Sequence, residues 1–107
     1  PVTSKSNADW VRDGVRISDG AAVGAGSVIL AGSSIGAWSM VGAGSVVLQD
    51  VPDHALVVGN PARQIGWVGR SGHRLVESDS GWFCPETQEF YRVEGTGLTH
   101  VGSGSAL

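Results

Sequence analysis

Few side chains in this 107-residue sequence could carry out acid–base, nucleophilic or metal chemistry. The candidates are three histidines and one cysteine, at His54, His73, His100 and Cys84. His54 and His73 lie in segments with turn-forming residues, and His100 lies in a Gly- and Ser-rich tail, so we expect all three to be solvated. A solvated histidine in a turn or tail is poorly placed to act as a general base. We therefore assign no catalytic residue.

The cysteine count limits both metal binding and cross-linking. A structural zinc site needs four ligands, and Cys84 with its neighbour His73 supplies only two. We therefore predict no metal site. One cysteine also excludes an internal disulfide and is typical of proteins in the reducing cytoplasm.

An aliphatic residue recurs at every sixth position, and this period indicates the elements that would position any site. Small residues, mostly Gly, Ala and Ser, fill the space between the aliphatic members of the series. The series is Val11, Ile17, Val23, Ile29, Ile35, Val41 and Val47. This period fits neither an α-helix nor an alternating strand, and a flexible Gly-rich linker would not maintain it, so it indicates a repeat architecture.

The repeat predicts an all-β solenoid of triangular cross-section. Three hexads make one coil, with the aliphatic residue of each pointing inward and a glycine or other small residue at each corner. Adding eighteen then stacks Val11 under Ile29, and Ile29 under Val47. Trp38 occupies a corner where glycine is the rule, so its ring should project outward from the prism.

Residues 11–58 are therefore predicted to form a parallel β-helix of about two to three coils. Its hydrophobic core should end near Pro52, because the next two positions in the six-residue series are Asp53 and Gly59. Residues 1–10 should form a loop that leads into the prism. Residues 59–95 should form a strand and hairpin extension, with a hairpin between Trp82–Cys84 and Glu89–Val93. Residues 96–107 are rich in Gly, Ser and Thr and are expected to be disordered.

Composition excludes two classes of partner. The net charge is −3 and the isoelectric point is about 5.4, with no basic run, so a nucleic-acid surface is not expected. No apolar stretch approaches the ~20 residues of a membrane-spanning helix, so we predict no membrane insertion.

Four segments carry a family resemblance. They are MVGAGSVVLQDVP (Met40–Pro52), GNPARQIGW (Gly59–Trp67), GHRL (Gly72–Leu75) and CPETQEFYRVEG (Cys84–Gly95). They resemble the C-terminal part of hexapeptide-repeat acyltransferases, and most closely the UDP-2-acetamido-3-amino-2,3-dideoxyglucuronate N-acetyltransferases. The resemblance implies a left-handed parallel β-helix, a homotrimer, and acetyl-CoA in the groove between neighbouring prisms. It also implies a cytoplasmic role in the biosynthesis of cell-surface lipopolysaccharide.

The resemblance implies a coenzyme site on four residues. Ala25 and Ala43, one coil apart, would offer backbone amides to the pantetheine arm, and Gly44 would allow its close approach. Arg63, in the Pro-Ala-Arg phrase, matches an arginine that binds the CoA phosphates. Gln49 stands where the family commonly has a lysine, which removes one phosphate partner.

The resemblance also indicates what the chain lacks. Acetyl transfer to a sugar amine needs a group that accepts the amine proton, and in many such enzymes this is a histidine on an earlier coil. No hexad of this chain carries a histidine. Two readings follow: the C-terminal part of a UDP-amino-sugar N-acetyltransferase, inactive alone, or a non-catalytic trimeric module that keeps assembly and CoA binding.

Overall fold

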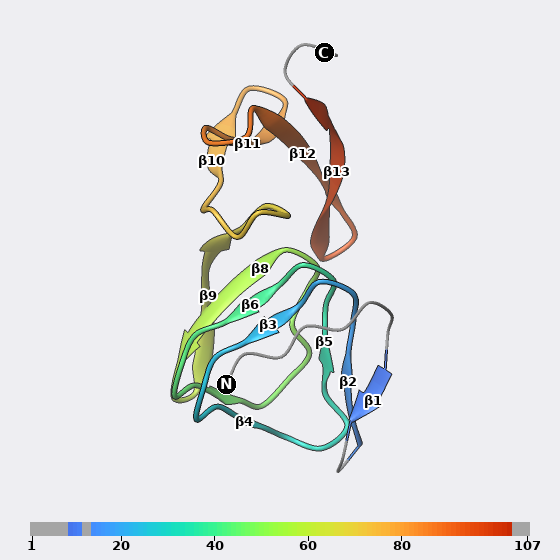
Figure 1. Cartoon of the computed structure of the whole chain (residues 1–107), viewed down its shortest axis with the longest axis vertical. Helices are drawn as coiled ribbons and strands as arrows, with labels where there is room; N and C mark the ends of the chain where they lie inside the picture. Colours follow the sequence, from blue (N-terminus) through green and yellow to red (C-terminus); the bar gives the residue numbers. More distant parts are fainter. Residues whose placement is uncertain (1–8, 12–13, 104–107) are drawn as a thin grey trace.

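The chain forms two units stacked end to end, a triangular prism and an antiparallel sheet (Figure 1). The structure, a computed structural model, describes residues 9–11 and 14–103, with residues 9–11 described by their backbone alone. No α-helix occurs in these ranges, so none of their residues forms a helix that could cross a membrane. The described chain is all-β, as the period predicted.

Short parallel strands build the three faces of the prism. Neighbouring coils pair eighteen residues apart, with Arg16 opposite Ser34 and Ala22 opposite Met40. The first face contains β2 (Val15–Ile17) and β5 (Ser34–Ile35). The second contains β3 (Ala22–Val23), β6 (Met40–Val41) and β8 (Ala55–Gly59), and the third contains β4 (Val28–Ile29) and β7 (Val46–Val47).

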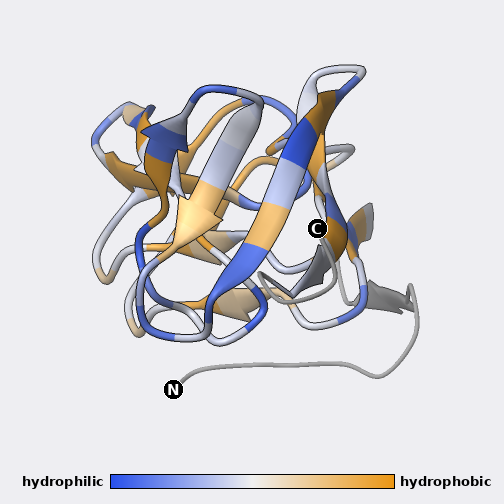
Figure 2. Cartoon of the chain, turned by 90° about the horizontal axis from the view of Figure 1, so that it is seen from above, coloured by the Kyte–Doolittle hydropathy of each residue, from blue (hydrophilic) through white to orange (hydrophobic). Residues whose placement is uncertain are grey.

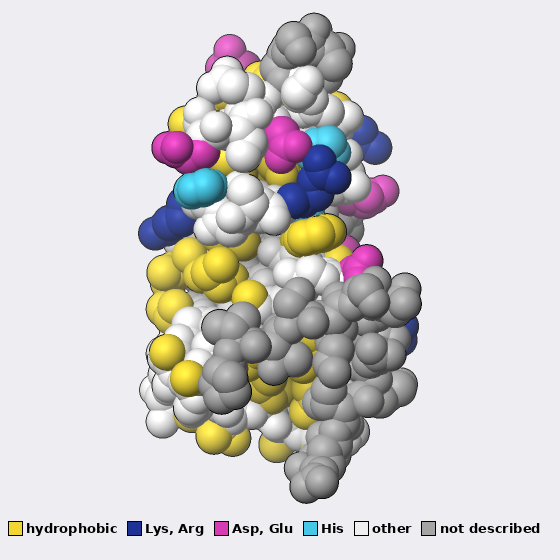
Figure 3. All heavy atoms as spheres, viewed as in Figure 1, with side chains coloured by type: hydrophobic (Ala, Val, Ile, Leu, Met, Phe, Trp, Pro, Cys, Tyr) yellow, Lys and Arg dark blue, Asp and Glu magenta, His cyan; other side chains and the backbone are white. Residues whose placement is uncertain are grey.

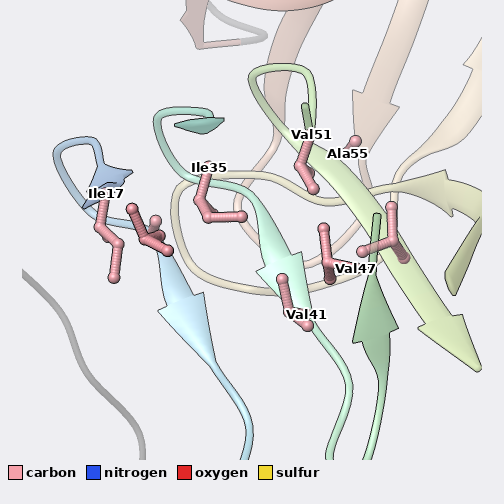
Figure 4. Close-up of a cluster of buried hydrophobic side chains, with 9 residues drawn as sticks. Ile17, Ile35, Val41, Val47, Val51 and Ala55 are labelled. Atoms are coloured by element: carbon pink, nitrogen blue, oxygen red, sulfur yellow. The ribbon is translucent and has the colours of Figure 1, made fainter. Parts of the chain in front are cut away.

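The inward aliphatic residues form one continuous core (Figure 4). Ile17, Ile35, Val41 and Val47 are all at most 4% exposed. Seen from above, apolar and hydrophilic segments alternate along the ribbons (Figure 2). Each coil directs only a few aliphatic side chains inward, so the prism has a narrow core and its stability depends on the stacking of its coils.

The lower end of the prism differs from the prediction at Val11. β1 (Asp9–Val11) runs antiparallel to β2, with Val11 opposite Val15, so Val11 does not lie under Ile29. β4, which contains Ile29, pairs only with β7 in the described chain. The predicted loop over residues 1–10 is therefore wrong for Asp9 and Trp10, and residues 1–8 lie outside the described range.

The upper end extends beyond Pro52, because the register slips by two residues. Val51 pairs with Ile35 and Val57 with Val41, sixteen residues apart instead of eighteen. Two carboxylates supply hydrogen-bond acceptors where the register slips. Asp50 Oδ1 accepts a hydrogen bond from the Ser34 amide at 2.8 Å, and Asp53 Oδ1 accepts one from the Ala37 amide at 2.8 Å. Both valines are at most 6% exposed, so the prediction that the core ends near Pro52 is wrong.

One corner is occupied by a large side chain. Trp38 has a φ of 60°, a conformation that glycine adopts at the equivalent corners. Its ring is partly buried and lies over Gly20 on the coil below, where any Cβ would collide with ring atoms. The ring therefore covers the corner of its own prism and does not project freely outward.

The second unit is a four-stranded antiparallel sheet with its own core. After β8 the chain turns back along it as β9 (Ala62–Trp67), and then forms the sheet. The strands are β10 (Val76–Ser78), β11 (Gly81–Cys84), β12 (Glu89–Glu94) and β13 (Gly97–Ser103), called the C-terminal sheet below. The β11–β12 hairpin forms as predicted, with Phe83 opposite Phe90.

The predicted disordered tail is the main correction in this unit. Residues 97–103 pair with β12 along their whole length, so disorder is wrong for them, and residues 104–107 lie outside the described range. Leu98 is 3% exposed and joins the buried cluster of the sheet. The disorder prediction relied on the Gly-rich composition. It did not take into account the buried Leu98 or the turn at Gly95 that precedes the strand.

Candidate functional site

The corner between the second and third faces stacks the small residues that the resemblance singled out. Ala25 and Ala43 are both exposed and lie one coil apart, and the Gly44 amide donates to the Ala25 carbonyl at 2.9 Å. The β6–β8 register then brings Gly59 beside Ala43 as a third level. In Figure 1 these turns follow one another where the left ends of β3, β6 and β8 are aligned. We call this stack the alanine corner.

Close backbone contact is what keeps the alanine corner free of larger side chains. A Cβ on Gly24 would lie 2.5 Å from the Ala43 nitrogen and 2.7 Å from its Cα. A Cβ on Gly42 would lie 2.6 Å from Val58 Cγ1. Gly44 has a φ of 70°, which side chains rarely adopt. The corner is therefore a smooth, exposed strip of backbone.

Two amides on this strip are available to a ligand. Within residues 9–11 and 14–103, no acceptor lies against the backbone N–H of Ala25 or Ala43. Exposed amides one coil apart, at the strand spacing of ~4.8 Å, can donate to successive carbonyls of an extended ligand.

Two serine hydroxyls, of half-buried Ser27 and buried Ser45, hold the levels of the corner together. Ser27 Oγ donates to the Gly42 carbonyl at 3.0 Å, and Ser45 Oγ accepts the Gly59 amide at 3.1 Å. Ser45 is 0% exposed, so it positions the corner and does not itself reach a ligand. The sequence analysis did not identify Gly59 as part of this corner. The eighteen-residue coil spacing leads from Ala43 to Pro61, and the two-residue slip in register cannot be seen in the period.

Arg63 belongs to the same sheet but stands two strands from Ala43. It lies on β9 directly opposite Val58, so the two side chains share a face of the sheet. Val58 rests against Gly42, which brings this face to the alanine corner. Arg63 is exposed, and no acidic side chain in the described chain pairs with it. Its guanidinium is free to bind an anion.

A cleft of about 250 Å³ lies at the upper end of the prism. Its lining consists of Val47, Leu48, Gln49, Asp50, Val51, Pro52, Val57, Ala62 and Gln64. Gln49, which replaces the lysine of the family pattern, is exposed on this lining. A carboxamide cannot neutralise the charge of a phosphate, so Gln49 leaves that role to cations such as Arg63.

The histidines are not placed as the sequence predicted. His54 is 3% exposed, and its Nδ1 donates to the Val68 carbonyl at 2.8 Å, so the prediction of a solvated residue is wrong. His100 lies on β13, with Nε2 3.4 Å from Glu89 Oε2, and not in a disordered tail. His73 is exposed in a turn, as predicted, with Nδ1 2.8 Å from Ser71 Oγ. None of the three lies at the alanine corner. His54 occupies a different corner, that of the slipped coil, with a φ of 65° close to the 60° of Trp38.

Polar groups surround Cys84. Among the described residues, no three His, Cys, Asp or Glu side chains gather as a possible metal site. Cys84 is fully buried. Burial opposes ionisation of its thiol, but hydrogen bonds from Thr87, Glu86 and Ser71 lower its pKa overall. Ser71 and Thr87 therefore act as hydrogen-bonding partners of the sulfur.

Comparison with known proteins addresses the prism. Residues 14–49 match the family described as bacterial transferase hexapeptide (six repeats). This segment is similar to the hexapeptide repeats of bacterial transferases. Together with the structural likenesses below, the repeats make the prism a left-handed parallel β-helix, as predicted.

Two solved acetyltransferases resemble the chain over about half its length. Serine acetyltransferase from Brucella abortus strain S19, in complex with coenzyme A, is 45% identical, with a TM-score of 0.51 over 51% of this chain and 22% of its own. Maltose O-acetyltransferase from Clostridium difficile 630 is 42% identical, with a TM-score of 0.50 over 51% of this chain and 29% of its own. This chain therefore spans less than a third of either protein. No curated protein matches it.

The close contact at the alanine corner predicts a sharp steric effect. Gly24→Ala should lower the free energy of unfolding by about 1–3 kcal/mol, because the new methyl group meets the Ala43 backbone, which cannot move without separating two coils. Urea unfolding followed by circular dichroism measures the change. Gly102→Ala is the matched control, since its Cβ meets nothing within 4 Å, and it should change stability by less than about 0.5 kcal/mol. Equal stability of the two variants would contradict the stacking described here.

Proposed function

We propose that the chain is the coenzyme-binding, C-terminal part of an acetyl-CoA-dependent N-acetyltransferase that acts on a UDP-linked amino sugar. The hexapeptide repeats over residues 14–49 and the likeness to two acetyltransferases support acyl transfer. The observation that carries the proposal is the alanine corner, an exposed strip of backbone with unpaired amides at two successive coils. The sugar class rests on the resemblance of the segments from Met40 to Gly95.

Acetyl-CoA fits the alanine corner by its chemistry. The pantetheine arm is extended and carries two amide groups, whose carbonyls can accept from Ala25 and Ala43. Gly44 leaves room for the arm, and Arg63 would bind the phosphates with charge-assisted hydrogen bonds. The Brucella serine acetyltransferase was solved with coenzyme A, which supports this assignment.

The described residues bind and orient more than they catalyse. Attack of an amine on the thioester needs a proton acceptor and a donor to the developing oxyanion. The corner amides would already donate to the pantetheine carbonyls, His54 is bonded to Val68, and His100 lies beside Glu89 and Arg70. The proton acceptor and the sugar-binding groups would then lie in other coils of the complete protein.

A homotrimer is part of the proposal, and one face of the prism favours assembly. Val28, Leu30 and Leu48 are 60%, 53% and 52% exposed and follow the third face and its corner. Exposed apolar stripes of this kind are typical of protein interfaces. Figure 3 shows hydrophobic side chains gathered on the prism and charged ones on the upper unit. We place the protein in the cytoplasm, in lipopolysaccharide biosynthesis, where its single free thiol would stay reduced.

The second candidate function is a non-catalytic trimeric module that keeps CoA binding. The commitment of His54 and His100 to structural contacts favours it. Thiol release from acetyl-CoA in the presence of UDP-amino sugars distinguishes the two. The assay uses a longer protein that includes any residues encoded upstream of Pro1. Turnover by this protein would support the enzyme, whereas CoA binding without turnover would support the module. Turnover by residues 1–107 alone would contradict both.

Arg63 allows a direct test of coenzyme binding. Arg63→Gln should weaken CoA binding about ten- to hundredfold, because a hydrogen bond to a charged partner contributes about 1.5–3 kcal/mol. Isothermal titration calorimetry measures the affinity. Arg92→Gln, which changes an exposed arginine on β12, is the matched control and should bind like the wild type. Unchanged affinity in Arg63→Gln would remove Arg63 from the site.

The apolar face predicts the effect of a buried charge on assembly. Val28→Lys should convert the trimer to smaller species in sedimentation velocity experiments, because burial of an unpaired lysine in an apolar interface is energetically unfavourable. Val93→Lys is the control, since Val93 is 62% exposed on the C-terminal sheet. A wild-type protein that sediments as a monomer at all concentrations would overturn the trimer.

A further inference from the structure

His54 joins the two units at the upper end of the prism. The Val68 amide donates to the His54 carbonyl at 2.8 Å, and His54 Nδ1 donates to the Val68 carbonyl at 2.8 Å. These residues immediately precede β8 and follow β9, so the two bonds close the base of the β8–β9 hairpin. The imidazole is 3% exposed.

The C-terminal sheet rests on the opposite side of this imidazole. The Tyr91 ring meets it edge-on, with 5.0 Å between centroids, and His100 meets Tyr91 in the same way at 5.3 Å. Beside it, the turn before β13 sits on Asp53, whose carbonyl accepts the Leu98 amide at 3.2 Å. Gly97 has no room for a Cβ there, because Asp53 N and O would lie 2.8 Å from it.

The hydrogen bonding defines the protonation state of His54. A carbonyl oxygen can only accept, so Nδ1 carries a hydrogen and the neutral ring leaves Nε2 unprotonated. A second proton would therefore place a full positive charge in the buried contact between the units. Burying a charge without a dedicated partner is costly.

The charged groups around the ring do not provide that partner. Asp53 attracts a positive charge, whereas Arg70 and His100 repel it. The carboxylate of Glu89 is already bound by Arg70 at 2.9 Å and by Tyr91 at 3.1 Å, and His100 lies 3.4 Å from it. Burial lowers the pKa of His54 below its usual value, and it outweighs the opposing effects of the Val68 carbonyl and Asp53.

We propose that His54 is a proton-sensitive latch that holds the C-terminal sheet on the prism. When the ring takes up a second proton it becomes hydrated, and the sheet separates from the prism end. The prism stays folded, because its buried cluster does not include His54 and meets the sheet's cluster only through Trp67. The latch is independent of the proposed coenzyme chemistry.

The direction of the pH dependence follows from linkage. A histidine whose pKa is lowered in the closed state binds its proton better in the open state, so acid favours opening. The closed state should be most favoured above the usual pKa of 6.5 and should weaken as the pH falls below it. One proton can increase the opening equilibrium by at most about tenfold per pH unit.

Amide hydrogen exchange resolved by NMR tests the latch on the full chain. Between pH 7.5 and about pH 5, protection factors of the C-terminal sheet, at Tyr91 and Leu98, should fall by up to about tenfold per pH unit. Those of the prism, at Ile35 and Val41, should stay constant. The pKa of the His54 ring in the same spectra should lie below the usual histidine value of 6.5.

His54→Asn is the informative variant. Asparagine tolerates the φ of 65° at this position, and its side-chain amide can donate to the Val68 carbonyl without titrating. Protection of the sheet in this variant should no longer depend on pH, whereas His73→Gln should behave like the wild type. The same pH dependence in His54→Asn as in the wild type would overturn the proposal. If the asparagine variant does not fold, a wild-type His54 pKa at or above the usual 6.5 would overturn it as well.

Discussion

Stacking of coils at the spacing of hydrogen-bonded strands is the constraint on which this structure depends. At ~4.8 Å between coils, backbone approaches backbone so closely that some positions have no room for a side chain. Gly24 and Gly42 meet this limit directly, since a Cβ on either would lie within 2.6 Å of the next coil. Ala25 and Ala43 directly follow these two glycines, and their amides have no acceptor in the described chain. The feature that stabilises the prism therefore also produces its candidate binding surface.

The ends of the solenoid follow different physics from its middle. In the middle, each coil supplies the hydrogen-bonding partners of the next. At the top, the register slips by two residues, and Asp50 and Asp53 accept the amides of Ser34 and Ala37 at the slipped turns. The chain then reverses into β9 and covers the end with a second small core. His54 lies at this change of architecture, which explains why a turn residue becomes buried.

The middle of the fold could be predicted from the sequence, because its period is local and strict. Inward positions from Ile17 to Val47 and the β11–β12 hairpin are as predicted. The predicted position of Val11 and the predicted end of the core near Pro52 were wrong. A periodic pattern identifies the residues that follow it, but it does not predict the structure of the chain beyond them. In the candidate site, Ala25, Ala43 and Gly44 meet at one corner, whereas Gly59 was missed because the slip displaced it.

The sequence by itself determined the inward and outward sides of the solenoid, since branched aliphatic residues alternate with small ones at fixed spacing. Only the tertiary structure decided the surroundings of His54, Glu89 and Leu98. Their long-range partners, Val68, Arg70 and Asp53, lie 14, 19 and 45 residues away in the chain, in segments without a repeat that would predict the contacts. Burial of such residues depends on how two units pack, and no short-range pattern in the chain encodes that packing.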